Sequence, residues 1–292
     1  MTPLVISDGK ARAVVRPDLG AGLARYDLAD GTPLFRPAPD GTTEPFALAC
    51  ILMVPWCSRI RGGGFEYDGE YYALPANVKG EALPLHGSGF QQQWRVTRAE
   101  ATRVDLELEC NVPFPFRYTA RASYELRDGA LHMLLAVVNA SDRALPYGLG
   151  FHPWLPRPPG TTLQLAATGV WLSDPQVLPT QLVPVTTQPD WDFSSPRTLP
   201  SAGIDNVFAG CSGRASLAWP EQRLALDIDA GAGLDHCIVF SPPTGDAFVC
   251  VEPVTHAPDA YNLPGGAVAN GLVELLTDEE LAVECRFVPR RL

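Results

Sequence analysis

The sequence predicts an all-β protein built as a large antiparallel β-sandwich, and three observations lead to that prediction. Asp-Gly pairs begin at positions 8, 30, 40, 68 and 128, and such pairs tolerate the positive φ angles of hairpin turns. Between these turns, several segments alternate apolar and polar residues with the period of two that a half-buried strand requires. The 29 prolines and 26 glycines interrupt most stretches that would otherwise form a long helix. We therefore expect few helices, all of them short.

The alternation is clearest in five segments. The first covers residues 103–110, where four apolar side chains alternate with four polar ones. Residues 120–126 and 131–137 flank Asp128-Gly129 and predict a long antiparallel hairpin. Residues 224–228 and 281–287 repeat the pattern near the C-terminus.

Two proline-rich stretches, residues 153–159 and 178–200, are expected to be loops because of their composition. Neither separates regions of different character, and no internal repeat stands out. We expect one domain that covers residues 1–292.

Composition narrows the functional classes. Of the 292 residues 46% are hydrophobic, which is enough to build a large core and excludes a chain that is disordered throughout. The net charge of −11 repels nucleic acid and anionic membrane surfaces, so we expect neither as a partner. No apolar run approaches the roughly 20 residues of a membrane span, and the N-terminus lacks the order of a signal peptide. A cytoplasmic location is expected.

Several common motifs are missing. The seven cysteines show no metal-binding or redox spacing, and we interpret them as reduced, buried residues. Neither of the two lysines completes a phosphate-binding loop, and the dinucleotide fingerprint, the GxSxG elbow and HExxH are all absent. Nucleotide hydrolysis and serine hydrolase chemistry have no support.

Two of the five histidines have unusual neighbours. His86 precedes Gly87-Ser88-Gly89, and His152 lies between a Gly-rich segment and Pro153. Both patterns are typical of the edge between a strand and a loop, where functional residues gather. Trp154 follows closely and offers a flat apolar face suited to a sugar ring. His132 and His236 are expected to be an ordinary strand residue and an ordinary turn residue.

One carboxylate and one guanidinium also stand out. Glu252 follows the apolar strand that starts at Phe248 and precedes Pro253, which places an acid at the expected tip of a buried element. Apolar neighbours move the pKa of a carboxyl group toward neutrality, as suits a general base. Arg59 follows an apolar run and precedes three glycines, where it can clamp hydroxyls or a carboxylate.

In their order along the chain, these segments resemble the aldose 1-epimerase (galactose mutarotase) family, whose members fold as large antiparallel β-sandwiches. The segment around Arg59 is similar to the family's Asn-Arg-Ile motif. Ser58 replaces the Asn, which weakens the inference of a substrate contact at position 58. Other similar segments are Leu85-His86-Gly87, Gly150-Phe151-His152-Pro153-Trp154, Ile204-Asp205-Asn206, Val251-Glu252-Pro253 and Leu263-Pro264-Gly265-Gly266.

The resemblance implies an isomerase that interconverts the α and β anomers of an aldohexose. It implies that His152 is the acid at the ring oxygen and Glu252 the base at the anomeric hydroxyl. His86 would bind near the ring oxygen, while Asp205 and Arg59 would hold other hydroxyls. An ordinary histidine pKa near 6.5 would leave a usable protonated fraction of His152 near neutrality. No cofactor and no metal are needed, the partner is a small neutral sugar, and the protein is expected to be a monomer or a homodimer.

Three alternatives remain at this level. A hexose-6-phosphate 1-epimerase would need a cluster of cations, which Arg59 and Arg61 could begin. A non-catalytic sugar-binding protein would keep the aromatic platform without needing both an acid and a base. A metalloenzyme would use His86, His152 and Glu252 as ligands. His256, four residues beyond Glu252, is a further candidate for the same cleft.

Overall fold

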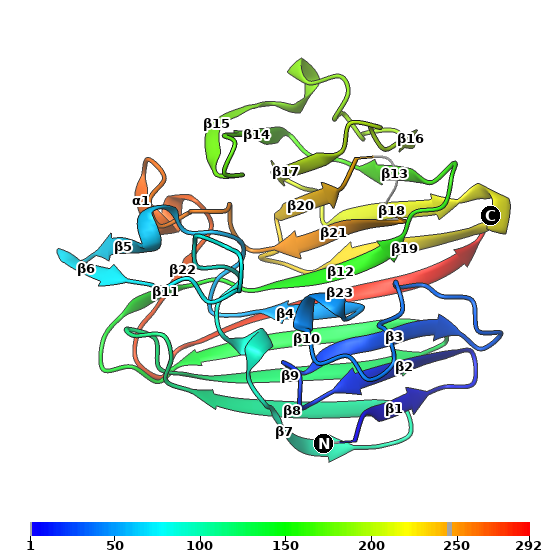
Figure 1. Cartoon of the computed structure of the whole chain (residues 1–292), viewed down its shortest axis with the longest axis horizontal. Helices are drawn as coiled ribbons and strands as arrows, with labels where there is room; N and C mark the ends of the chain where they lie inside the picture. Colours follow the sequence, from blue (N-terminus) through cyan, green and yellow to red (C-terminus); the bar gives the residue numbers. More distant parts are fainter. Residues whose placement is uncertain (1, 244–246) are drawn as a thin grey trace.

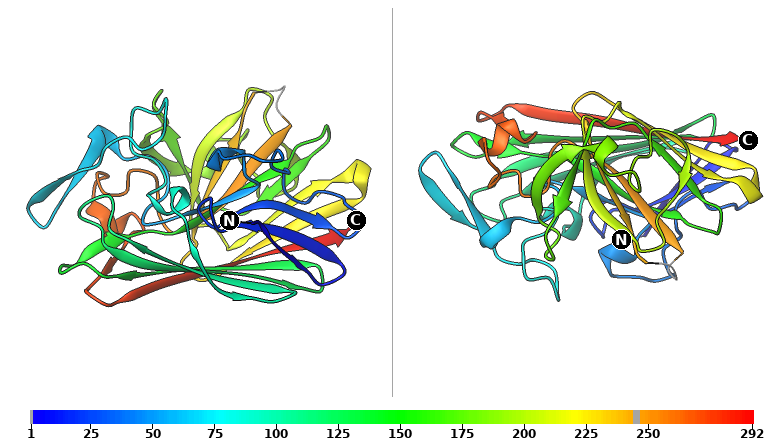
Figure 2. Two further views of the ribbon diagram at one scale, coloured as in Figure 1. Left: turned by 60° about the horizontal axis from the view of Figure 1, so that its bottom comes forward. Right: turned by 90° about the horizontal axis from the view of Figure 1, so that it is seen from above.

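The computed structural model describes residues 2–243 and 247–292, and most of the strands over these residues lie in two large antiparallel sheets (Figure 1). The sheets pack on one another around a shared hydrophobic core, as the turned views in Figure 2 show. Tyr26 illustrates the contact between them, because its hydroxyl donates to the carbonyls of Gly129 and Phe287 on the opposite sheet. The predicted all-β sandwich is confirmed.

The first sheet has ten strands, in the spatial order β1 (Leu4–Ser7), β2 (Ala11–Arg16), β3 (Gly22–Leu28), β4 (Cys50–Met53), β12 (Gly150–Pro156), β21 (Phe248–Val254), β20 (His236–Ser241), β17 (Ile204–Ala209), β14 (Gly169–Ser173) and β15 (Pro179–Pro184) within the described residues. The second has nine, in the order β16 (Arg197–Thr198), β13 (Thr162–Leu165), β18 (Arg214–Trp219), β19 (Leu224–Ala230), β23 (Glu280–Arg291), β10 (Ala130–Asn139), β9 (Tyr118–Arg127), β8 (Arg103–Cys110) and β7 (Arg95–Ala99).

The remaining elements are short. Two small sheets pair β5 (Gly64–Tyr67) with β6 (Glu70–Ala73) and β11 (Leu145–Tyr147) with β22 (Val273–Leu275). In the described part of the chain the α-helix α1 covers only Gly266–Ala269, and the 3-10 turns are η1 (Pro45–Ala47), η2 (Arg61–Gly63), η3 (Gly89–Gln91), η4 (Val185–Thr187) and η5 (Pro220–Gln222). No helix there has the length and apolarity needed to cross a bilayer.

The hairpin predicted around Asp128-Gly129 is present as β9 and β10, with Arg127 opposite Ala130. Both turn residues have positive φ, 53° and 85°, which matches the twist of the flanking strands. The alternating segments 103–110, 224–228 and 281–287 lie within β8, β19 and β23. All seven cysteines are unpaired, and six of them are buried.

The predicted ends of two important strands were wrong. Pro153 lies inside β12 and Pro253 inside β21, so neither proline ends its strand, and β15 and β16 also occupy part of the expected loop 178–200. Between β12 and β21 the paired positions are Gly150 with Val254 and then, after an interruption, Trp154 with Cys250. Both prolines fall in the interruption, where a missing N–H removes no bond from this ladder.

The alternation of side chains along β12 and β21 decides which of them point into the core and which point to the outer face of the sheet. In β12, Phe151 and Leu155 join the core between the sheets, whereas Trp154 belongs to a separate cluster on the other face. In β21, Val249 and Val251 join the same core, and Cys250 lies with Trp154. By the same alternation, His152 and Glu252 leave the core and share the outer face of the ten-stranded sheet.

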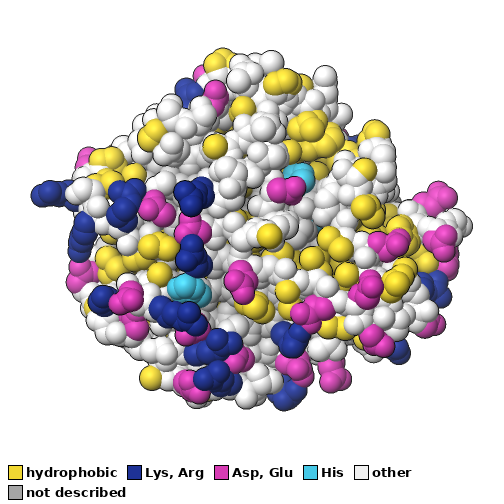
Figure 3. Space-filling model, turned by 180° about the vertical axis from the view of Figure 1, so that it is seen from behind, with side chains coloured by type: hydrophobic (Ala, Val, Ile, Leu, Met, Phe, Trp, Pro, Cys, Tyr) yellow, Lys and Arg dark blue, Asp and Glu magenta, His cyan; other side chains and the backbone are white. Residues whose placement is uncertain are grey.

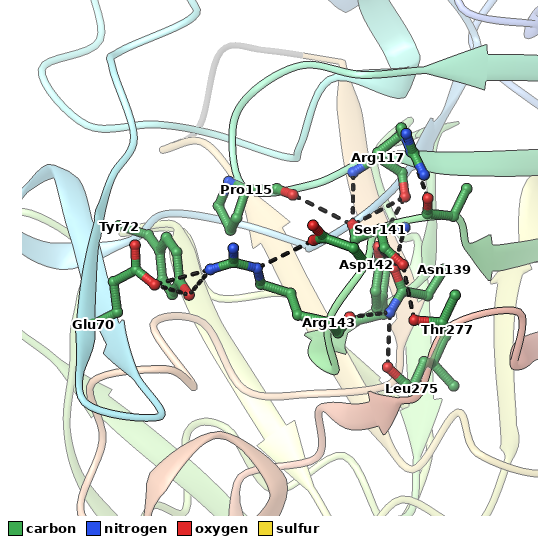
Figure 4. A network of polar contacts seen from close by, with 12 residues as sticks. Glu70, Tyr72, Pro115, Arg117, Asn139, Ser141, Asp142, Arg143, Leu275 and Thr277 are labelled. Atoms are coloured by element: carbon green, nitrogen blue, oxygen red, sulfur yellow. Dashed lines mark hydrogen bonds and ion pairs between the residues drawn. The ribbon is translucent and has the colours of Figure 1, made fainter.

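A polar network, exposed at Glu70 and Arg143 and buried at Asn139, anchors the β5–β6 hairpin to the body of the protein (Figure 4). Arg143 donates to Glu70 at 2.8 Å and to the Tyr72 hydroxyl at 3.0 Å, which ties β6 to the loop after β10. Beneath it, the fully buried Asn139 donates to the carbonyls of Leu275 and Arg143, both at 2.8 Å. The hairpin leads into residues 74–88, so the network steadies the segment that carries His86.

The outer face of the nine-stranded sheet is charged. Basic and acidic side chains lie interspersed on the face that Figure 3 shows. On this sheet Arg103 pairs with Glu125, Arg286 with Asp229 and Arg290 with Asp227 across neighbouring strands. A hollow of about 370 Å³ lies on this sheet, but its arginines Arg103 and Arg121 pair with acidic neighbours and leave no reactive group.

Candidate active site

A cavity of about 490 Å³ lies on the outer face of the ten-stranded sheet. It combines aromatic side chains with a small number of charged ones, as small-molecule sites commonly do. All six residues that the sequence singled out line it: Arg59, His86, His152, Trp154, Asp205 and Glu252. They come from β12, β17, β21 and the loops on either side of the β5–β6 hairpin, so only folding brings them together.

The centre of the cavity is a histidine–carboxyl pair. The register of β12 and β21 brings His152 opposite Glu252, and His152 Nε2 lies 3.4 Å from Glu252 Oε1. Both side chains are deeply buried, with exposed fractions of 8% and 2%. Their other polar atoms, His152 Nδ1 and Glu252 Oε2, have no hydrogen-bond partner among the described residues. Such unsatisfied buried groups are costly and call for a functional explanation.

Burial sets the protonation of this pair. Desolvation lowers the pKa of His152 to about 3, with a further decrease from the positive charge of Arg36. Desolvation also raises the pKa of Glu252 well above its usual value, with a smaller contribution from Asp205. Both shifts disfavour the charged forms, so burial favours a single proton on Glu252 over an imidazolium–carboxylate pair. The expectation of an ordinary His152 pKa near 6.5 is wrong, because the sequence did not reveal this depth of burial.

His86 is held by its own loop. Its backbone φ is +57°, and its Nδ1 accepts a hydrogen bond of 3.0 Å from the N–H of Ser58. Because Nδ1 is an acceptor, we assign the ring proton of the neutral imidazole to Nε2. The rings of His86 and His152 meet edge to face, with centroids 5.2 Å apart. Burial and the neighbouring His152 keep the pKa of His86 well below its ordinary value, so His86 offers a neutral N–H donor.

Gly87 makes this loop possible. Its φ is +72°, and a Cβ atom at this position would lie 2.1 Å from the carbonyl oxygen of Val54. Only glycine allows the chain to pass so close to β4 while His86 is presented to the cavity.

A second group of charges lines the cavity. Arg59 donates from Nε and Nη2 to Glu81, at 3.3 and 3.2 Å. Burial raises the pKa of Asp205 to about 6, although the charge of Arg59 partly opposes the increase. Ser58, which replaces the family's Asn, is buried and also lines the cavity. Asp205 and Arg59 thus bring two polar groups to the same cavity.

Trp154 does not present the open aromatic face that was expected from the sequence. Its ring stacks on His152 with a centroid distance of 4.0 Å and an interplanar angle of 20°, and only 4% of the residue is exposed. Little of the indole face is left open to serve as a sugar platform. The stacking instead fixes the plane of the His152 imidazole.

Two further predictions can be compared with the geometry. His256 does not line the cavity: its Nε2 accepts from the Cys57 N–H at 2.9 Å and its Nδ1 donates to the Ala257 carbonyl at 2.7 Å. Arg61 turns to Asp259 and Asp174 and likewise does not line the cavity, so Arg59 and Arg61 form no shared cation cluster.

The sequence reasoning missed Arg36 and Cys250. Arg36 lines the cavity but belongs to no motif, since it lies after β3 in a segment without alternation. Cys250 lies close to His152 and Glu252, and the possible ligand atoms of these three side chains lie within 4.8 Å of one another. Among the described residues, this group could hold a metal ion such as zinc. The expected metal set included His86 in place of Cys250. Burial raises the pKa of the Cys250 thiol well above its usual value, which opposes the thiolate that zinc requires.

A large antiparallel β-sandwich with a polar cavity on one outer face defines the class of fold, and comparison with known proteins agrees with this class. The family model described as aldose 1-epimerase matches residues 3–288. The chain belongs to the aldose 1-epimerase family.

Individual relatives extend the likeness over nearly the whole chain. The uncharacterized protein YphB of Escherichia coli K12 is 31% identical over 272 residues, which cover 91% of this chain and 92% of YphB. A crystal structure of an Escherichia coli K12 protein superposes with a TM-score of 0.93 at 27% identity and covers 100% of this chain and 99% of its own. A galactose mutarotase-like protein from Clostridium acetobutylicum has a TM-score of 0.85 at 17% identity, covering 99% and 95% of the two chains, and shows the shared fold.

Proposed function

We propose that this protein is an aldose 1-epimerase that interconverts the α and β anomers of an aldohexose. The observation that carries the proposal is the buried His152–Glu252 pair, 3.4 Å apart, with one unsatisfied polar atom on each side chain. Family membership supports an isomerase, and the cavity that holds this pair is also lined by other polar groups.

The reaction needs one acid and one base. Glu252 accepts the proton of the anomeric hydroxyl while His152 delivers a proton to the ring oxygen. The bond between C1 and the ring oxygen then breaks and leaves an open-chain aldehyde. After rotation about the C1–C2 bond, the C5 hydroxyl attacks the other face of the aldehyde, and the two proton transfers run in reverse.

The proton count of the pair suits this cycle. Burial favours the arrangement with the proton on Glu252, whereas the reaction as written starts with that proton on His152. The two arrangements differ only by a shift across the 3.4 Å contact. Sugar hydroxyls that donate to the Glu252 carboxylate favour this shift, because they replace the solvation that burial removed. His86, as a neutral donor, would steady the ring oxygen.

The alternative of a non-catalytic sugar-binding protein explains less. Hydroxyl recognition accounts for Arg59 and Asp205, but a binding protein gains nothing from burying an unsatisfied histidine and an unsatisfied carboxyl group at its centre. The retained acid and base favour catalysis.

Polarimetry of freshly dissolved α-glucose and α-galactose tests the proposal. We expect the protein to accelerate the approach to anomeric equilibrium, and Glu252→Gln and His152→Asn each to lower kcat by about 10²- to 10⁴-fold, the usual contribution of a positioned proton transfer. His132→Asn, on the opposite sheet, is the matched control and should retain activity. A spontaneous rate that the wild-type protein leaves unchanged with every aldose tried would refute the proposal.

A further inference from the structure

We propose that His256 is a positioning residue for the epimerase reaction, because it holds the backbone that fixes the His86 imidazole in one orientation and one tautomer. This inference rests on the proposed function and adds to it a residue that lies outside the cavity. It begins from a buried histidine for which the acid–base reaction itself has no use.

His256 is itself firmly fixed. Only 1% of the residue is exposed, and its Nδ1 donates to the carbonyl of Ala257 at 2.7 Å. The ring packs against Gly148, where a Cβ atom would lie 2.1 Å from His256 Cδ2. The preceding N–H, that of Thr255, donates to the carbonyl of Leu149 at 3.0 Å. The ring therefore has little room to turn, and its Nε2 is an acceptor with a fixed direction.

The acceptor of His256 is used by the loop that carries Arg59. Because Nδ1 donates, Nε2 of the neutral ring accepts, and it accepts from the N–H of Cys57 at 2.9 Å. Burial lowers the pKa of His256 to about 4, so the ring keeps this lone pair at neutral pH. A buried backbone N–H rarely stays without a partner, and His256 is the partner of Cys57. The bond ties the loop to the segment that follows β21.

Two consecutive N–H groups connect His256 to His86. One residue after Cys57, the N–H of Ser58 donates to His86 Nδ1 at 3.0 Å, and the Ser58 carbonyl accepts from the backbone N–H of His86, also at 3.0 Å. Ser58 has a φ of +61°, which is costly for a residue other than glycine and persists only where the surroundings enforce it. A displacement of Cys57 would pass directly to Ser58 and from there to the His86 ring.

Arg59 is held by a different residue of the same segment. The N–H of Asp259 donates to the Arg59 carbonyl at 3.0 Å, and Asp259 Oδ1 accepts from the N–H of Arg61 at 2.8 Å. Loss of the bond between His256 and Cys57 should therefore disturb His86 while Asp259 still anchors Arg59. An effect that depends on His86 is the signature of this role.

His256→Gln and His256→Asn form a matched pair of tests. Glutamine places an amide oxygen near the Nε2 position and keeps an acceptor for Cys57, whereas asparagine is one methylene shorter and reaches only the Nδ1 position. We expect His256→Asn to lower kcat/KM for anomer exchange by about tenfold, and His256→Gln to restore most of it. Tyr26→Phe, which removes buried hydrogen bonds between the two sheets, is the control for lost stability and should lower Tm without lowering kcat/KM.

A double-mutant cycle assigns the effect to His86. His86→Asn tolerates the positive φ and keeps an acceptor for the Ser58 N–H, but it removes the Nε2 donor. With that donor gone, its placement no longer matters. We therefore expect His256→Asn to change kcat/KM by less than about twofold when His86→Asn is already present.

A nuclear magnetic resonance measurement reads the same coupling without catalysis. Long-range ¹H–¹⁵N correlation of histidine-labelled protein distinguishes protonated from bare ring nitrogens, and His86→Asn identifies the signals of His86. The wild-type protein should show His86 with its proton on Nε2 and a bare Nδ1. His256→Asn should shift these signals toward a mixture of tautomers, and His256→Gln should bring them back.

The outcomes separate this inference from the proposed function. Wild-type kcat/KM in His256→Asn, an equal effect with and without His86, or a His256→Gln variant as slow as His256→Asn would overturn the positioning role and leave the epimerase proposal intact. If the wild-type protein accelerates no anomer exchange, the epimerase proposal fails. His86 signals that still shift in His256→Asn would then support the coupling, and unchanged signals would overturn it.

Discussion

The strongest test of the site electrostatics is the stability of Glu252→Gln as a function of pH. Glu252 is 2% exposed, and burial raises its pKa in the folded protein well above the value of 4.5 in the unfolded chain. For a carboxyl group with a raised pKa, stability is fully present below the unfolded pKa and is lost as the pH rises toward the folded pKa. Glutamine has nearly the shape of the protonated acid and does not titrate, so the variant escapes this loss.

The size of the effect follows from linkage. Near pH 4 the variant and the wild type should differ by no more than about 1 kcal/mol in the free energy of unfolding. Above pH 4.5 each further pH unit should favour the variant by about 1.4 kcal/mol, until the folded pKa is reached. With about 2.1 cal/mol/K of unfolding entropy per residue, 292 residues give about 0.6 kcal/mol/K, so each pH unit corresponds to about 2 °C in Tm.

Differential scanning calorimetry of both proteins between pH 4 and pH 7 measures this difference. Both proteins contain His152, whose lowered pKa also makes stability depend on pH. The difference in Tm between the two proteins therefore removes most of the contribution of His152. Glu221→Gln, at an exposed position in η5, is the matched control and should show a difference that does not change with pH. A Tm difference for Glu252→Gln that stays constant from pH 4.5 to pH 7 would refute a raised pKa for the buried Glu252.

Three further predictions concern activity and the His86 loop. After subtraction of the spontaneous rate, kcat/KM should show no titration near pH 6.5, because burial lowers the pKa of His152 to about 3; a half-maximal rate near pH 6.5 would contradict this protonation. Gly87→Ala should lower the free energy of unfolding by at least about 2 kcal/mol and reduce activity, since its Cβ would meet the Val54 carbonyl at 2.1 Å; a chemical denaturation curve that superposes on the wild-type curve would show that the loop relaxes freely. Dialysis against EDTA should leave the mutarotation rate unchanged because the pair supplies both the acid and the base, whereas loss of activity with recovery on adding zinc would indicate metal binding at His152, Cys250 and Glu252.

Much of the fold was predictable because it depends on local patterns. The β9–β10 hairpin follows from two alternating segments around Asp128-Gly129, and both turn residues have the positive φ that this dipeptide favours. The strand ends at Pro153 and Pro253 were not predictable, because a proline stops a strand only where its missing N–H is needed. That depends on the neighbouring strand, which a single segment does not reveal.

Sequence alone determined the class of fold, through the alternation of side chains and the turn residues, and it identified six of the side chains that line the cavity, through ordered motifs. Only the tertiary structure decided how these groups are charged and which others join them. The pKa values of His152 and Glu252 depend on burial between strands distant in sequence, and Trp154 stacks on His152 only because the fold brings their rings together. Electrostatic energy depends on distance and solvent exposure in three dimensions, and the order of the residues alone gives neither quantity.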